Sequence, residues 1–102
     1  MIEQLRDKLA DELAQVDWRD LRQHAARGAL FIVSGDLGLL EATLGIARDD
    51  RAAVETWLQS GALARPTDAQ LSAWESELDK PFEYLIAQPF VLARALPIAD
   101  AQ

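Results

Sequence analysis

The chain has 102 residues, of which 50% are hydrophobic and 26% are charged, values typical of one folded domain rather than a disordered segment. It contains no cysteine, which excludes disulfides, thiolate metal ligands and thiol nucleophiles. With 17 acidic and 10 basic residues the formal net charge is −7, so a polyanion such as DNA would be repelled unless positive side chains were concentrated on one face.

The N-terminal stretch MIEQLRDKLADELAQV is charged throughout and therefore lacks the apolar core of a signal peptide. No apolar run approaches the roughly 20 residues that a membrane-spanning helix needs. We therefore expect a cytoplasmic protein with no membrane partner.

The first third of the chain predicts two helices and a strand. Apolar residues at helical spacing predict a first helix over 2–16 and, after an N-cap at Asp17, a second helix over 18–27. The run ALFIV, residues 29–33, is rich in β-formers and is bounded by glycines. This pattern favours a buried strand.

Two further helices are predicted in the middle of the chain. The segment 37–48 is apolar on two sides, which indicates a helix in the interior. Asp49 or Asp50 caps a fourth helix, which ends at Gly61. Its predicted inward residues are Ala53, Val54, Trp57 and Leu58. We interpret the three tryptophans, Trp18, Trp57 and Trp74, as core anchors.

The last part of the chain predicts a strand, a helix and another strand. ALARP, residues 62–66, indicates a short strand, and Thr67-x-x-Gln70 is a capping-box pattern that opens a fifth helix. From Phe82 apolar residues alternate, which predicts a strand. Because Pro89 cannot donate a ladder hydrogen bond, it marks a bulge, an edge or the first turn of a helix. The segment after it is therefore either strand or helix.

From Trp18 onward this order of elements is that of a winged helix. We predict an α+β fold: a helix-rich single domain over 1–96 with a small antiparallel sheet, winged-helix-like, with an additional N-terminal helix and a helix inserted at the wing. We expect residues 97–102 to form a flexible tail.

The segment GIARDDRAAVETWL resembles a DNA-reading helix pair in pattern but not in charge. The outward residues of its second helix include one acid, Glu55, and no base, whereas phosphate contacts need lysine or arginine. The neighbouring Asp49 and Asp50 offset Arg48 and Arg51. We therefore interpret the two aspartates as helix caps and do not expect nucleic acid as a partner.

The most positive window of the chain is WRDLRQHAARG. It carries Arg19, Arg22 and Arg27 against one acid, Asp20, with His24 at the border of the apolar stripe. Clustered guanidinium groups suit a carboxylate, a phosphate or an acidic protein surface. We take Arg19, Arg22, His24 and Arg27 as candidate binding residues. The alternative is a solvated face that pairs with the acidic first helix or with a neighbouring subunit.

His24 is the only histidine, so no histidine-rich zinc signature is present. No G-x-S-x-G elbow accompanies any serine. We expect no metal site and no cofactor, and the sequence identifies no catalytic residue. An enzyme would have to be centred on His24. The alternatives are that His24 is partly buried and hydrogen-bonded in a structural role, or that it is solvated.

Three segments together carry a family resemblance: VDWRDLRQHAARGALFIV, IARDDRAAVETWLQSGALARPT and FEYLIAQPFVL. In that order they resemble a family of short bacterial proteins known as a domain of unknown function, number twenty-two eighty-eight in that series. The resemblance extends to about Leu92 and implies a stand-alone member, but no activity or cofactor. It places His24, Arg27, Gln88 and Pro89 inside the most specific segments without assigning them a role.

We expect a non-enzymatic protein-interaction module, either homodimeric or bound to an acidic partner protein through the winged-helix-like surface or the arginine face. One alternative is a nucleic-acid-binding or regulatory protein that uses Arg19, Arg22 and Arg27. The second alternative is a small enzyme centred on His24, which would require a pocket and a carboxylate beside the imidazole. The three hypotheses differ in where these four side chains point.

Overall fold

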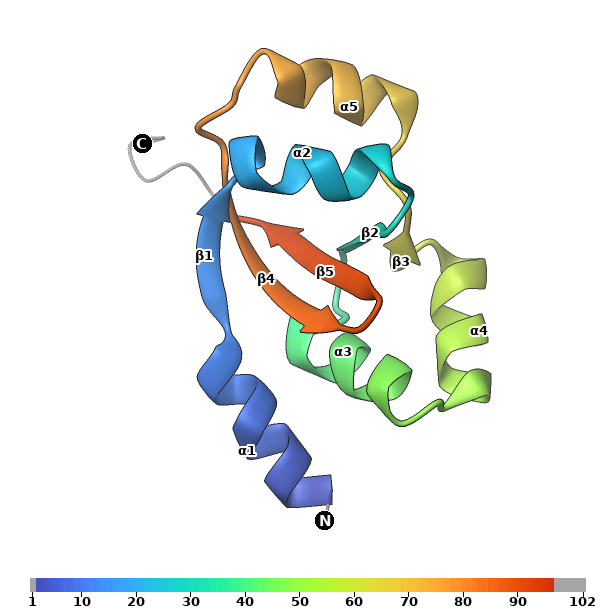
Figure 1. Cartoon of the computed structure of the whole chain (residues 1–102). Helices are drawn as coiled ribbons and strands as arrows, with labels where there is room; N and C mark the ends of the chain where they lie inside the picture. The colour runs from blue at the N-terminus through green and yellow to red at the C-terminus, as the bar shows by residue number, and fades with distance from the viewer. Residues whose placement is uncertain (1, 97–102) are drawn as a thin grey trace.

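A five-stranded mixed sheet lies at the centre of the structure, with helices on both of its faces (Figure 1). The computed structural model describes the backbone of residues 2–96 and the side chains of residues 4–96. Within these residues the chain forms a single α+β domain. Its elements are α1 (Ile2–Glu12), β1 (Ala14–Asp17), α2 (Trp18–Ala26), β2 (Leu30–Val33), α3 (Leu39–Ala47), α4 (Arg51–Ser60), β3 (Leu63–Ala64), α5 (Asp68–Glu75), β4 (Pro81–Ala87) and β5 (Phe90–Ala95).

The strands are arranged in the order β1-β4-β5-β2-β3. β5 runs parallel to β2, with Leu30 opposite Val91, and every other neighbouring pair is antiparallel. β4 and β5 form a hairpin whose turn is Gln88–Pro89, joined by a cis peptide bond. The parallel pair is possible because β2 and β5 are separated by a long connection that includes three helices and two strands.

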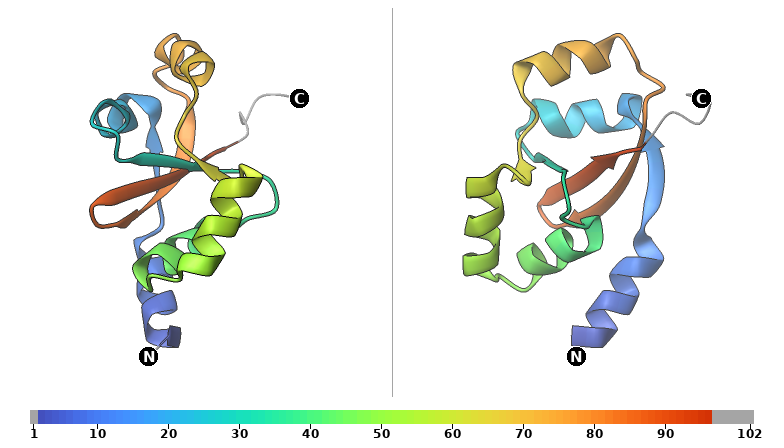
Figure 2. Two further views of the ribbon diagram at one scale, coloured as in Figure 1. Left: turned by 90° about the vertical axis from the view of Figure 1, so that its right-hand side faces the viewer. Right: turned by 180° about the vertical axis from the view of Figure 1, so that it is seen from behind.

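The sheet has a separate hydrophobic core on each face because side chains alternate along every strand. Figure 2 shows α2 and α5 on one side of the sheet and α3 and α4 on the other. On the α2/α5 side, Trp18, Trp74 and Phe82 pack together, with ring centroids 5.0–5.9 Å apart. The buried members of this core are Trp18, Leu21, Leu30, Ile32, Trp74, Phe82, Val91 and Ala93.

The second core lies between the sheet and the α3–α4 pair. Its buried members are Val33, Leu39, Ala42, Leu63, Leu85, Ala87 and Leu92. α3 packs against β4, β5, α1 and α4, which confirms the prediction of an interior helix. Gly45 of α3 is buried where the ring of Trp57 on α4 approaches. The absence of a side chain at Gly45 thus allows the two helices to come close.

The capping signals predicted from the sequence are present. The Asp50 side chain accepts a hydrogen bond from the Ala53 N–H at 3.3 Å, and Gly61 ends α4 in the left-handed conformation, with φ of 84°. Thr67 and Gln70 form the predicted capping box, with N···O distances of 3.1 and 2.9 Å. Each of these elements therefore begins or ends close to where local chemistry places its boundary.

The prediction of one helix over 2–16 is wrong at its C-terminal end. α1 ends at Glu12, and Ala14–Asp17 forms the edge strand β1, antiparallel to β4. Val16 packs against the α2/α5 core from this strand. The position of Val16 in the sequence fits the apolar spacing of the first helix and also fits a strand. The strand forms because β4 is available to pair with it.

The predicted antiparallel sheet is also corrected. The sheet is mixed because β5 lies beside β2 and runs parallel to it, so the winged-helix-like arrangement is not confirmed. The segment after Pro89, for which strand and helix were both open, is strand β5. Leu58, predicted to face inward, is 46% exposed. The predicted tail over 97–102 lies outside the described residues.

Candidate functional site

Arg19 and Arg22 project from α2, and each is paired with acidic side chains of the same molecule. The Arg19 guanidinium lies 3.1 Å from an Asp79 oxygen and 3.7 Å from an Asp17 oxygen. Arg22 forms an ion pair with Glu75, the last residue of α5. The partners are acids at the end of β1, at the end of α5 and in the turn after α5, so the expected pairing of these arginines with the acidic first helix is wrong.

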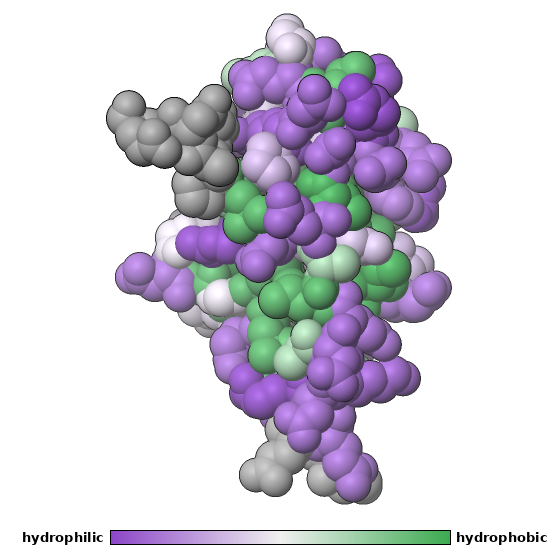
Figure 3. Space-filling view, turned by 90° about the vertical axis from the view of Figure 1, so that its left-hand side faces the viewer, coloured by the Kyte–Doolittle hydropathy of each residue, from purple (hydrophilic) through white to green (hydrophobic). Residues whose placement is uncertain are grey.

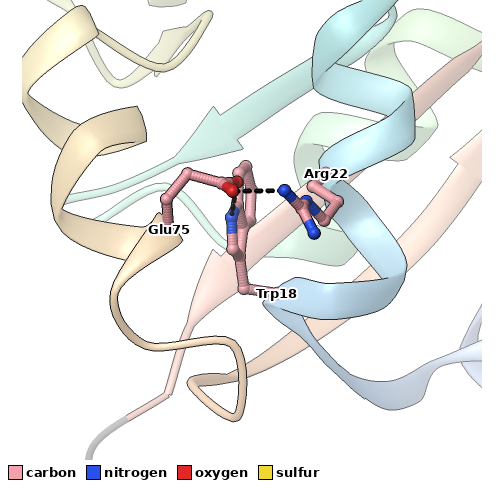
Figure 4. Close-up of polar contacts among 3 residues, drawn as sticks. All are labelled: Trp18, Arg22 and Glu75. Atoms are coloured by element: carbon pink, nitrogen blue, oxygen red, sulfur yellow. Dashed lines mark hydrogen bonds and ion pairs between the residues drawn. The ribbon is translucent and has the colours of Figure 1, made fainter.

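Glu75 joins α5 to α2 through two side chains at once (Figure 4). One carboxylate oxygen accepts the indole N–H of Trp18 at 2.8 Å, and the other accepts a guanidinium N–H of Arg22. Trp18 is only 1% exposed, so this hydrogen bond satisfies the polar atom of a core residue. The cluster holds two helices together, and the charge of Arg22 is already paired with that of Glu75.

His24 and Arg27 form a second, separate pair at the end of α2. An Arg27 N–H donates to His24 Nδ1, with an N···N distance of 2.6 Å. This arrangement requires an unprotonated Nδ1 and hence the neutral imidazole with its proton on Nε2. Burial, followed by the charge of Arg27, lowers the pKa of His24. Its hydrogen-bonding partner is thus a cation rather than the carboxylate that a catalytic histidine would need.

The four candidate residues therefore form two groups rather than one continuous positive surface. None of the four lines the pocket beside α4 or the pocket between α1 and β4 that the described residues form. Within the described residues, no three or more histidine, aspartate or glutamate side chains gather closely enough to hold a metal ion. No helix in that part of the chain is long and apolar enough to cross a membrane.

Sequence reasoning missed an apolar pocket of about 330 Å³ on the α3/α4 side. We call it the α4 pocket. It is lined by Phe31, Ile46, Asp49, Asp50, Arg51, Val54, Glu55, Leu58, Leu63 and Phe90. These residues come from β2, α3, the α3–α4 turn, α4, β3 and the start of β5. Residues so far apart in the chain carry no shared local pattern, and only the fold brings them together.

The floor of the α4 pocket is held in place by aromatic contacts. The rings of Phe31 and Phe90 meet edge to face, with centroids 5.5 Å apart. The guanidinium carbon of Arg65 lies 5.2 Å from the Phe31 ring centroid, and its Nε–H donates to the Gly28 carbonyl at 3.2 Å. The Phe90 ring and the Arg65 guanidinium thus contact the Phe31 ring from within the protein and help to orient it in the pocket lining.

The rim of the α4 pocket is polar and carries an excess of negative charge. Asp49, Asp50 and Glu55 contribute three carboxylates, against one guanidinium from Arg51. Arg51 lies 3.6 Å from Asp49, and Asp50 caps α4. Glu55 is exposed and forms no side-chain hydrogen bond or ion pair with the described residues. An apolar floor beneath a negative rim is therefore the main chemical feature of this surface.

A second pocket, of about 560 Å³, lies between α1 and β4. It is lined by Leu5, Lys8, Leu9, Glu12, Ala47, Tyr84, Leu85, Ile86, Ala87 and Gln88. Ile86 is 42% exposed, and Leu13, next to the pocket-lining Glu12, is 41% exposed. Figure 3 shows the side of the molecule that carries β1 and α1, where hydrophobic atoms gather across the middle between hydrophilic regions.

The sequence matches the family described as protein of unknown function, DUF2288, over residues 4–95. The chain belongs to this family. The resemblance seen in the three sequence segments is thereby confirmed, and the family description names no activity.

A solved structure supports the fold of this DUF2288 member. The NMR solution structure of PA1075 from Pseudomonas aeruginosa is 29% identical in sequence and aligns with a TM-score of 0.78. The alignment covers 97% of this chain and 91% of that chain. No curated protein matches the sequence.

Proposed function

We propose that this DUF2288 protein is a non-enzymatic protein-interaction module and that the α4 pocket is its binding site. The observation that carries the proposal is a concave surface formed by six apolar side chains, Phe31, Ile46, Val54, Leu58, Leu63 and Phe90. Leu58 is 46% exposed there. Ligand sites are typically concave and mostly apolar, with a few polar groups that fix orientation.

The chemistry of the pocket favours binding over catalysis. Its side chains provide carboxylates and one guanidinium but no hydroxyl, amine or imidazole. His24 lies outside it and pairs with Arg27, so nothing here pairs a nucleophile with a base. The pocket volume, about 330 Å³, is at the lower end of the roughly 300–1,000 Å³ usual for ligand sites. Such a space suits a few side chains of a partner protein.

The arginine face is the weaker candidate, both for an acidic protein and for nucleic acid. Arg19 and Arg22 already pair with Asp79 and Glu75. A polyanion would have to displace these carboxylates against a net charge of −7. The nucleic-acid alternative is therefore not the function we propose.

A selection from a random peptide library, displayed on phage, against the immobilised full chain tests the proposal. We expect enriched peptides that lose binding to Leu58→Asp, because a buried carboxylate opposes an apolar ligand. Ala73→Asp is the control, since Ala73 is an exposed apolar residue of α5 and lines neither the α4 pocket nor the pocket between α1 and β4. The proposal is wrong if no peptide is enriched, or if binding survives Leu58→Asp as well as it survives Ala73→Asp.

A homodimer is the second candidate, favoured by the exposed Leu13 and Ile86 near the α1–β4 pocket. Apolar side chains gathered on one face are typical of interaction surfaces. In sedimentation velocity we expect the wild-type chain to dimerise as concentration rises and Ile86→Asp to remain monomeric. A wild-type chain that stays monomeric at every concentration contradicts the homodimer. It does not contradict the proposal that the α4 pocket binds a partner protein.

A further inference from the structure

We infer that the partner of the α4 pocket is a protein segment that inserts a large apolar side chain and carries lysine or arginine beside it. This inference rests on the proposed function and specifies the chemistry of its ligand. It follows from two independent properties of the pocket, the shape of its apolar floor and the sign of the charge on its rim.

The floor determines the apolar part of the ligand. Phe31, Phe90 and Leu63 belong to the sheet, and Ile46, Val54 and Leu58 to the two helices. The edge-to-face contact between Phe31 and Phe90 leaves ring surfaces in the pocket lining. An inserted aromatic or large aliphatic side chain would bury these surfaces together with its own, and the gain is proportional to the apolar area removed from water.

The rim determines the charged part of the ligand. Arg51 is next to Asp49, at 3.6 Å, and offsets at most one of the three carboxylates. Asp50 uses one oxygen as the helix cap, and its side chain forms no ion pair with the described residues. Glu55 is exposed and has no cationic partner among the described residues. A lysine or arginine next to the inserted side chain would thus find carboxylates at the mouth of the pocket.

The net charge of the whole molecule also favours a basic partner segment. The net charge of −7 attracts a basic segment and repels an acidic one before contact. Because the rim is exposed, each ion pair is worth about 1.5- to 5-fold in affinity rather than more. The apolar anchor therefore supplies most of the binding, and the basic residues discriminate between segments.

The composition of the selected peptides tests the inference. Among displayed peptides whose binding depends on Leu58, we expect lysine and arginine to be enriched, and aspartate and glutamate depleted, next to a large apolar residue. Leu58-dependent peptides without this bias overturn the inference but leave the proposed function standing. A selection without any Leu58-dependent peptide overturns the proposed function itself.

Affinity measurements on one selected peptide give a second, independent readout. By fluorescence anisotropy we expect Glu55→Gln to weaken binding about 1.5- to 5-fold and raised NaCl to weaken it further. Glu77→Gln is the matched control, because Glu77 is also an exposed glutamate, follows α5 and does not line the pocket. Equal affinities of the Glu55→Gln and Glu77→Gln proteins, or binding that does not respond to salt, overturn the inference.

Discussion

The close approach of α3 and α4 gives a sharp prediction at Gly45. A Cβ atom built on Gly45 would lie 2.6 and 2.7 Å from two carbon atoms of the Trp57 ring. Carbon atoms in good contact are about 3.5–4.0 Å apart. Gly45→Ala therefore forces the indole or the whole of α4 to move by about 1 Å, by comparison with that contact distance.

Two opposing free-energy terms determine the size of the effect. Overpacking a core with one carbon atom costs about 1–3 kcal/mol, whereas replacing glycine by alanine inside a helix gains up to about 1 kcal/mol. The net expectation for Gly45→Ala is a loss of about 0–2 kcal/mol in the free energy of unfolding. In a Trp57→Leu background the clash is absent, so the same substitution should stabilise the protein by up to about 1 kcal/mol.

Urea unfolding, followed by circular dichroism, measures all four proteins of this double-mutant cycle. The informative quantity is the change of sign between the two backgrounds. If Gly45→Ala stabilises the wild-type chain as much as it stabilises the Trp57→Leu variant, then the Trp57 ring does not clash with a Cβ atom at position 45. The close approach of α3 and α4 would then not depend on the absence of a side chain at Gly45.

Three further predictions concern single side chains. Asp49 has a φ of 56°, so Asp49→Gly should raise the free energy of unfolding by about 0.5–1 kcal/mol and Asp49→Ala should lower it, both measured in urea. Glu75→Ala leaves the Trp18 indole N–H without its acceptor. It should therefore lower the free energy of unfolding in urea by about 1–3 kcal/mol. The pKa of His24, followed by NMR, should lie below its ordinary value and rise in Arg27→Gln. Because the folded-state pKa is lowered, the stability linked to His24 should be complete above pH 6.5 and decrease as the pH falls below it.

The sequence predicted best those features that depend on neighbours within one helical turn. Asp50 caps a helix through a group three residues away, and Gly61 ends that helix through its own backbone conformation. Thr67 and Gln70 satisfy each other's backbone N–H groups. Such interactions are complete within a short window, so a pattern in that window is sufficient evidence for them.

Sequence reasoning failed where the partner is distant. Ala14–Asp17 becomes a strand because β4 is available to pair with it, and nothing within the first helix pattern indicates that pairing. The parallel contact between β2 and β5 likewise depends on how the intervening elements cross the sheet. The sequence places Arg22 on the charged surface of α2, but its partner Glu75 is a residue of α5. Long-range pairing, rather than local propensity, determines these outcomes.

The Asp49–Asp50 turn has two roles: it forms the boundary between α3 and α4, and it contributes to the rim of the α4 pocket. From the sequence alone this turn predicts the helix boundaries, and in the structure the Asp50 side chain caps α4. At the end of α3, the Asp49 N–H donates to the Ile46 carbonyl and the Asp50 N–H donates to the Gly45 carbonyl. The same turn places both carboxylates at the rim of the α4 pocket. Their negative charge, which argues against a DNA-reading helix pair, is the property that would attract a basic segment. Since Asn also accepts a left-handed conformation and is a good N-cap, Asp49→Asn and Asp50→Asn change the charge of the rim while preserving the turn, so these substitutions separate the binding role from the structural one.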